Sequence, residues 1–237
     1  MWLMDRIEPI IVALDFDNRS AAEAAVDRIG DECRFYKVGL ELLTSAGPEF
    51  VRHLVDRGNK VFLDLKLFEI PNSVAGAVRA AGELGVSLVT VHSMGGAGIV
   101  AAAVEAAADY PGLRVPALTV VTSMTDADLA ETGVDATVER QVPRLAALAH
   151  RAGCHGVVAS PQEVPVLRAA LGSGPLIVTP GVRLPGAGPL ADHARSGTPR
   201  AALADGASHV IVGRGVTRAP DPLAALRLVR ADLAGKG

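Results

Sequence analysis

Residues 60–73 read KVFLDLKLFEIPNS, and this stretch decides the fold. It opens with an apolar run typical of a buried strand, and two opposite charges, Asp64 and Lys66, follow. Residues i and i+2 of a strand face the same side, so the carboxylate and the ammonium are expected to point to one place. Buried charges are costly unless they are paired or functional. Their position just before Pro71 and a helical pattern therefore indicates an active site at a strand's carboxyl end.

The alternation of strand and helix recurs along the whole chain. Apolar runs rich in Val, Ile and Leu predict buried parallel strands at residues 9–15, 35–40, 60–66, 88–93, 115–121, 156–160, 176–180 and 209–213. Helical patterns lie between them, at residues 20–29, 48–57, 72–84, 97–108, 137–151, 161–171, 198–205 and 222–233. Ser20 and Glu23 predict a capping box at the first helix. The pattern predicts an α/β fold, a single (β/α)8 TIM barrel with residues 1–237 as one domain.

A doubly wound nucleotide-binding fold is the structural alternative. It would need a glycine-rich turn after the first strand, where residues 15–17 read DFD. The GGAG run at residues 95–98 lacks the spacing of that fingerprint. The barrel is therefore the favoured prediction. Its longest irregular stretch, residues 183–197, is long enough to suggest a functional loop.

The composition narrows the function classes. With 237 residues, 49% of them hydrophobic, the chain can bury one large core. A net charge of −3 and 3% aromatic residues argue against a nucleic-acid partner. No apolar stretch approaches the roughly 20 residues that span a bilayer, and the N-terminus lacks the pattern of a signal peptide. Two cysteines, Cys33 and Cys154, argue against a disulfide framework and favour a cytoplasmic setting.

Polar side chains at the predicted strand ends form the candidate site, because these ends meet at one mouth of a barrel. They are Asp15, Lys37, Asp64, Lys66, His92, Ser123, Arg183 and Arg214. Four charges of mixed sign at three neighbouring strand ends predict a mutually paired Lys–Asp–Lys–Asp cluster. His92 and Ser123 have an equally good structural interpretation, as groups that bond the nearby backbone. No residues have metal-ligand spacing, so neither a metal nor a cofactor is expected.

The last two strands predict a phosphate site. They end in TPGVR at residues 179–183 and VGRGVT at residues 212–217. Barrel phosphate sites are often built from these two loops, where glycine exposes backbone N–H groups. Arg214 lies between Gly213 and Gly215 and can present a guanidinium fork to a phosphate. The alternative is that these glycines only make a tight turn.

These motifs resemble the orotidine 5′-phosphate decarboxylase family, whose signature is D-x-K-x-x-D-I-P-N-T. Residues 64–73 read DLKLFEIPNS. Further matches follow in order: LD at 14–15, YKVG at 36–39, VH at 91–92, TSM at 122–124, TPGVR at 179–183 and VGRG at 212–215. The resemblance spans essentially the whole chain, and the combined set is highly specific.

The resemblance implies decarboxylation of orotidine 5′-monophosphate to uridine 5′-monophosphate and CO2, in pyrimidine biosynthesis and without a cofactor. It implies that Asp64 lies against the substrate carboxylate and that Lys66 protonates C6 of the pyrimidine. The ribose hydroxyls would be held by Asp15 and Lys37, and Lys37 would also join the charged cluster.

For the rest of the substrate, the resemblance implies that Ser123 contacts the pyrimidine edge. The phosphate would be bound by Arg214 and the backbone of Gly213, with Arg183 supporting that loop. The family is a homodimer with shared sites, so Glu69, Ile70 and Ser73 would serve the neighbouring subunit.

Three positions depart from the family pattern. Glu69 stands where the family has Asp, Phe68 replaces a residue that is often His, and His193 replaces a phosphate-binding Gln. These departures bear on turnover more than on the identity of the substrate. Two alternative functions stay open: a Mg²⁺-dependent sugar-phosphate lyase of the same superfamily, and a non-catalytic binder of nucleotide phosphate.

Overall fold

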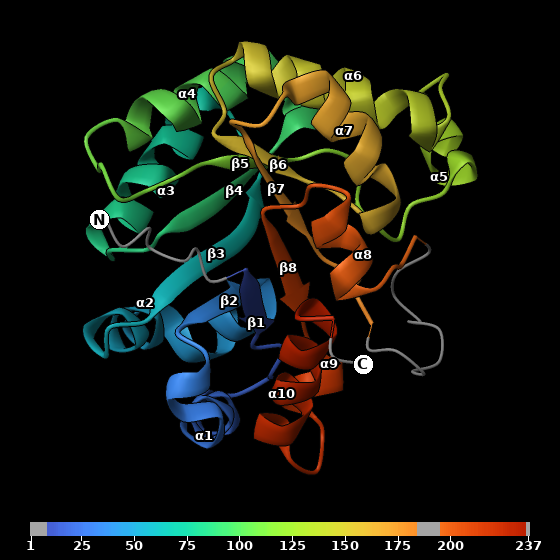
Figure 1. The fold of residues 1–237 in the computed structure, drawn as a ribbon. Helices are drawn as coiled ribbons and strands as arrows, with labels where there is room; N and C mark the ends of the chain where they lie inside the picture. The colour runs from blue at the N-terminus through green and yellow to red at the C-terminus, as the bar shows by residue number, and fades with distance from the viewer. Residues whose placement is uncertain (1–8, 184–194, 236–237) are drawn as a thin grey trace, which may run out of the picture.

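The computed structural model describes residues 9–183 and 195–235. Within these ranges eight parallel strands close into a barrel, in which each strand pairs with the next and β8 pairs with β1 (Figure 1). The strands are β1 (Ile10–Ala13), β2 (Phe35–Gly39), β3 (Lys60–Leu67), β4 (Leu88–His92), β5 (Pro116–Leu118), β6 (Gly156–Val158), β7 (Leu176–Thr179) and β8 (His209–Val212). Each overlaps its predicted range, so the predicted (β/α)8 fold is confirmed.

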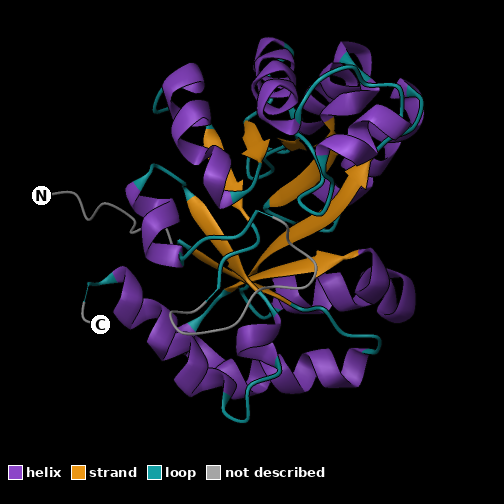
Figure 2. Cartoon of the chain, turned by 90° about the vertical axis from the view of Figure 1, so that its right-hand side faces the viewer, coloured by secondary structure: helices purple, strands orange, loops and turns teal. Residues whose placement is uncertain are grey.

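Helices surround the strands on the outside of the barrel (Figure 2). They are α1 (Arg19–Ile29), α2 (Leu40–Asp56), α3 (Pro71–Glu83), α4 (Ala97–Ala107), α5 (Asp126–Glu131), α6 (Val138–Arg151), α7 (Val164–Leu171), α8 (Pro199–Ala204), α9 (Arg214–Thr217) and α10 (Pro222–Leu233). Short 3₁₀ turns are η1 (Gly30–Glu32), η2 (Ser93–Gly95) and η3 (Pro161–Glu163). None of these helices is both long and apolar enough to span a bilayer.

Three α-helical segments were not predicted from the sequence. They are α5, α9 and the first part of α2, which precedes Gly47. Gly47 has a φ of 73° and separates two helical stretches, of which only the second matches the predicted range. Glycine reaches this left-handed backbone at little cost, so the chain can turn between the two stretches.

The predicted capping box at α1 is wrong. The N-cap is Asn18, whose side-chain oxygen accepts the backbone N–H of Ala21 at 2.8 Å. Ser20 lies inside the helix, and Glu23 instead pairs with Arg19 at 2.8 Å, one turn away. Asn is as good an N-cap as Ser, and it occurs two residues earlier in the chain.

The strands are apolar throughout because they are buried on both faces. In β1, Ile10 and Val12 pack in the larger hydrophobic cluster beneath the helices, whereas Ile11 and Ala13 belong to the cluster that fills the barrel. All four residues are at most 2% exposed. Parallel strands covered on both faces have this near-continuous apolar pattern. The polar residues that follow such strands must therefore lie at the barrel ends.

Candidate active site

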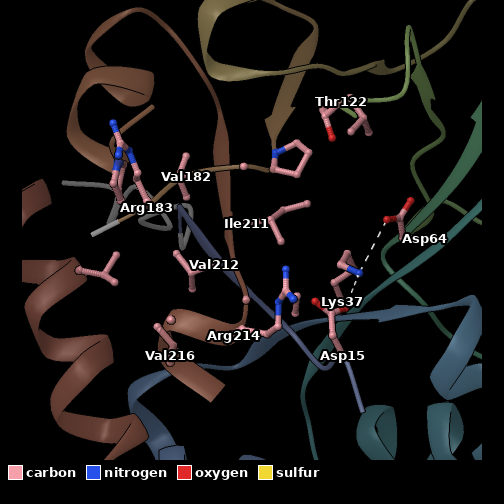
Figure 3. A pocket seen from close by; sticks show the side chains of 18 of the residues that line it. Asp15, Lys37, Asp64, Thr122, Val182, Arg183, Ile211, Val212, Arg214 and Val216 are labelled. Carbon is pink, nitrogen blue, oxygen red and sulfur yellow. Dashed lines mark hydrogen bonds and ion pairs between the residues drawn. The ribbon is translucent and has the colours of Figure 1, made fainter. Parts of the chain in front are cut away.

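A cavity of about 400 Å³ opens at the carboxyl ends of the strands. Its lining includes the charged residues Asp15, Lys37, Asp64, Lys66, Arg183 and Arg214 and the apolar residues Ala13, Leu118, Val121, Val158, Ile211 and Val212. In Figure 3, Asp15, Lys37 and Asp64 lie on one side, Arg183 lies on the other, and Arg214 lies between them. The cavity has the size and the mostly apolar character of a small-molecule site.

Four of the predicted charges form one continuous cluster. Lys37 Nζ lies 3.1 Å from Asp15 Oδ1 and 3.8 Å from Asp64 Oδ2 (Figure 3). Lys66 Nζ lies 2.9 Å from the same Asp64 oxygen. The Asp64 and Lys37 side chains are only 10% and 12% exposed, whereas Asp15 and Lys66 reach further into solvent. Alternating signs make the burial tolerable, because each buried charge has an opposite neighbour.

The end of β3 is irregular where this cluster is built. Leu63 pairs with Val89 and Leu67 pairs with Val91, so β3 advances four residues while β4 advances two. Lys66 has a φ of 52°, in the left-handed region that non-glycine residues avoid. Regular strand alternation through Lys66, as predicted from the sequence, is therefore wrong. The ammonium still meets Asp64, but it does so across a bulge.

Thr90 stabilises this bulge through two hydrogen bonds. Its hydroxyl accepts the backbone N–H of Lys66 at 2.8 Å and donates to Asp64 Oδ1 at 3.0 Å. The residue is fully buried in β4. Thr90 was not predicted from the sequence, because a Thr in an apolar strand is also an ordinary strand residue.

Two glycines leave room for the charged side chains. A Cβ on Gly39 would lie 3.3 Å from Lys37 Nζ, and a Cβ on Gly213 would lie 3.3 Å from Asp15 Oδ2. Such contacts are tight, so a larger residue at either position would press on the cluster. The glycine before Arg214 thus has a steric role beside the charged cluster as well as a place in the predicted phosphate loop.

The arginine end of the cavity is held by backbone hydrogen bonds. Arg183 N donates to Gly197 O at 2.9 Å, and Val182 and Gly197 form a parallel bridge. Gly197 N in turn donates to Gly181 O at 3.3 Å. Both flanks of residues 184–194 are thereby joined next to the cavity.

Arg195 anchors the second of these flanks and was not predicted. Its Nε lies 2.6 Å from Glu163 Oε1, and both side chains are largely buried. Its other guanidinium nitrogens donate to the carbonyls of Met124 and Val121, in the loop after β5. One planar guanidinium thus joins three segments of the barrel mouth, which suits its fork of donors.

Comparisons with known proteins agree with this geometry. The sequence model of the orotidine 5′-phosphate decarboxylase / HUMPS family matches residues 8–229. The chain belongs to this family. It is 46% identical to an orotidine 5′-phosphate decarboxylase of Moorella thermoacetica, over 98% of this chain and 97% of the relative. It is 49% identical to one of Anaeromyxobacter sp. (strain K), over 95% of this chain and 98% of the relative.

Solved structures show the same fold. A crystal structure of orotidine 5′-phosphate decarboxylase from Lactobacillus acidophilus superposes with a TM-score of 0.84 at 35% identity. The match covers 95% of this chain and 98% of that one. An uncharacterized conserved protein from Geobacillus kaustophilus gives a TM-score of 0.83 at 33% identity.

Within this decarboxylase-family barrel, the segment after Lys66 turns away from the chain's own cavity. Glu69 is fully exposed, and hydrogen bonds from the Ser73 hydroxyl and the Ile70 backbone lower the pKa of its carboxyl. Phe68 and Ile70 are 61% and 62% exposed. The structure therefore does not bring Glu69 or Ser73 to the cluster of the same chain.

The loop after β5 presents Thr122 to the cavity, and Figure 3 shows its side chain there. Ser123, the predicted pyrimidine contact, is exposed and does not line the cavity in this structure. Thr122 was missed because the sequence does not say which of two adjacent hydroxyls faces inward. His193, the predicted phosphate ligand, lies outside the described residues.

His92 lies beside the cluster without lining the cavity. Burial and then the neighbouring Lys66 charge lower its pKa, which favours the neutral imidazole. Its Nδ1 accepts the backbone N–H of Met94 at 3.3 Å, as the structural interpretation predicts. Within residues 9–183 and 195–235, no three His, Cys, Asp or Glu side chains are grouped to hold a metal ion.

Proposed function

We propose that this protein decarboxylates orotidine 5′-monophosphate to uridine 5′-monophosphate and CO2. The observation that carries the proposal is the ammonium of Lys66 held 2.9 Å from Asp64 at the mouth of an apolar cavity. The family membership and the names of relatives matched over nearly their whole length support the same reaction.

Each step uses side chains of the chain itself. The C6–carboxyl bond breaks, its electron pair stays on C6, and CO2 departs. Lys66 stabilises the developing carbanion as a fixed positive charge and then gives C6 a proton from Nζ. Asp64 lies against the substrate carboxylate and, by repulsion, favours its departure. Asp64 also holds the Lys66 ammonium in place.

The two ends of the cavity would bind the two ends of the nucleotide. Asp15 and Lys37 bind the ribose hydroxyls beside the cluster. The pyrimidine lies against Leu118, Val158 and Ile211, and the Thr122 side chain faces it in the cavity. Ser123 would reach the edge of the pyrimidine only if the loop after β5 turns it inward. The phosphate ligands we assign are His193, the Gly213 backbone and Arg214, with Arg183 supporting that loop. The phosphate binds away from C6, and its binding energy holds the reacting carbon in position.

A second copy of the chain would complete the site. Leu40, the first residue of α2, is exposed. Phe68 and Ile70 are exposed too, and an uncovered hollow lies beside these two. It is lined by Phe68, Glu69, Ile70, Pro71, Gly95, Gly98 and Ile99. Large exposed apolar side chains gathered in this way favour a protein interface. We assign it to a homodimer in which Glu69 and Ser73 reach the partner's cluster.

Mixing two inactive variants tests the shared site. In a mixed dimer of Lys66→Ala and Glu69→Ala subunits, both defects fall in the same shared site, so the other site keeps all its groups. Up to about a quarter of wild-type activity should then return on subunit exchange, since half of the subunits form mixed dimers with one intact site. No recovery in a mixture shown to exchange would refute the shared site.

Two further assignments complete the proposal. We assign residues 1–237 to a single domain, which the closed barrel from β1 to α10 supports. We assign the protein to the cytoplasm, where thiols stay reduced. The two cysteines of the chain, Cys33 and Cys154, are both buried.

A spectrophotometric assay of orotidine 5′-monophosphate loss, with and without chelator, tests the proposed reaction. Turnover that is unaffected by chelator and falls more than tenfold in Lys66→Ala is expected, a loss above ~1.4 kcal/mol. Loss of activity with chelator would point to a Mg²⁺-dependent lyase instead. Nucleotide binding without turnover would identify a non-catalytic binder.

A further inference from the structure

Thr90 occupies the point where the bulge of β3 meets β4. Its neighbours Val89 and Val91 pair with Leu63 and Leu67, so the Thr90 side chain lies opposite the irregular residues between them. A single oxygen, Thr90 Oγ1, accepts from Lys66 N at 2.8 Å and donates to Asp64 Oδ1 at 3.0 Å. Only a hydroxyl can accept and donate through one atom in this way.

The first of these bonds fixes the backbone of Lys66. The register shift takes this part of β3 out of the regular ladder with β4, and the Lys66 backbone has left the strand conformation. A buried N–H without a partner is destabilising, so the Thr90 hydroxyl supplies the acceptor that the bulge needs. The left-handed conformation, with its side-chain direction toward Asp64, therefore depends on this hydrogen bond.

The second bond fixes the rotation of the Asp64 carboxylate. Oδ1 is held by Thr90, and Oδ2 is left to face both Lys66 at 2.9 Å and Lys37 at 3.8 Å. Carboxylate torsions are broad, so an unrestrained Asp could turn either oxygen toward the lysines. Thr90 is itself stiff, because a β-branched side chain has few accessible rotamers.

We propose that Thr90 is a positioning residue for decarboxylation, which sets both the Lys66 backbone and the Asp64 carboxylate through one hydroxyl. This inference rests on the proposed function. Thr90 does not line the cavity and is 0% exposed, so it acts only through the two residues that it binds.

The residue that follows β5, the strand next to β4, offers a matched control. Thr119 is also 0% exposed, and its hydroxyl donates to the Val158 carbonyl at 3.2 Å. Thr119→Val removes one buried hydroxyl bond without touching the cluster, so it reports the structural cost alone. Thr90→Ser keeps the hydroxyl and removes only a methyl group.

The experiment measures kcat, the Kd of uridine 5′-monophosphate and the melting temperature for Thr90→Val, Thr90→Ser and Thr119→Val. Thr90→Val should lose roughly 10- to 100-fold in kcat, as for a buried hydrogen bond to a charged group. Its Kd for the product, which lacks the reacting carboxylate, should stay within about threefold of wild type. Thr90→Ser and Thr119→Val should keep kcat within about threefold of wild type.

Several results would overturn the inference. They are a Thr90→Val enzyme with unchanged kcat, a Thr90→Ser enzyme as slow as Thr90→Val, or a Thr119→Val enzyme equally slow. If Thr90→Val and Thr90→Ala both fail to fold, the hydroxyl holds the barrel rather than the site, and the inference also fails. A wild-type protein without turnover would instead overturn the proposed function, and this inference with it.

Discussion

The left-handed backbone of Lys66 predicts an unusual order of stabilities for two variants. Lys66→Ala and Lys66→Gly both remove the ammonium and both keep the N–H that Thr90 accepts. They differ in one respect, because alanine at a φ of 52° keeps the steric conflict of its Cβ whereas glycine has none. Both variants should lack decarboxylation, yet the glycine variant should be the more stable of the two.

The magnitude follows from two opposing effects. An L-residue in the left-handed region costs about 1–2 kcal/mol. Glycine loses more backbone entropy than alanine on folding, at about 0.5–1 kcal/mol. The difference leaves Lys66→Gly more stable than Lys66→Ala by ~0.75 kcal/mol at the midpoints of the two ranges, and by at most ~1.5 kcal/mol. Loss of the Lys66–Asp64 pair is common to both variants and cancels.

Equilibrium urea unfolding, monitored by circular dichroism, measures this difference as a shift of midpoint at constant slope. Lys60, an exposed residue at the start of the same strand, is the control because its backbone is regular. There the order should reverse, with glycine less stable than alanine by about 0.5–1 kcal/mol. If alanine is the more stable residue at both positions, Lys66 is not strained and the reasoning fails.

Three further predictions concern other parts of the molecule. Arg214→Ala should lower kcat/KM, with a loss of transition-state stabilisation of about 2–5 kcal/mol, the cost of removing one partner of a charge pair in a desolvated site. Uridine, which lacks the phosphate, should bind both proteins alike, and unchanged kinetics would exclude Arg214 as the phosphate ligand. Glu69→Asp should change kcat by less than about tenfold, whereas Glu69→Ala should cost much more by leaving a lysine of the partner's cluster underpaired; an alanine variant as fast as wild type would remove Glu69 from the site. Burial and then the charge of Lys60 lower the pKa of His209 to about 4 from 6.5. The unfolded chain therefore binds this proton first as the pH falls, and stability should be lost between about pH 6.5 and 4, by up to ~3 kcal/mol. His209→Phe keeps a ring against Phe35, and its melting temperature should depend less on pH over that range than that of wild type. An unchanged pH dependence would contradict the assignment of this effect to His209.

Much of the fold could be predicted because its signals are local. A strand buried on both faces has a short, continuous apolar sequence. This holds for β1 and β8, which are buried along their whole length. The helix α10 matches its predicted bounds, residues 222–233, since Asp221 caps its start and the pattern has no break inside it. Where two caps compete over a few residues, as with Asn18 and Ser20, the sequence alone misplaced the start of the helix.

The missed residues of the site have partners far along the chain. Thr90 bonds residues 24 and 26 positions away, and Arg195 bonds carbonyls 71 and 74 positions away. A threonine in a strand and an arginine in a loop have many ordinary explanations, so neither stood out. Their roles follow only from which segments the closed barrel places side by side.

The sequence by itself determined that Asp64 and Lys66 share one strand end, that glycine and arginine follow the last two strands, and that these segments alternate as a barrel requires. Only the tertiary structure decided that Thr122 rather than Ser123 lines the cavity, that Lys66 takes a left-handed backbone, and that Glu69 turns away from its own cavity. Strand and helix patterns arise from neighbouring residues. The spacing of the charges depends on the pairing of β1 with β2 and of β2 with β3, through hydrogen bonds that leave no local pattern in the chain.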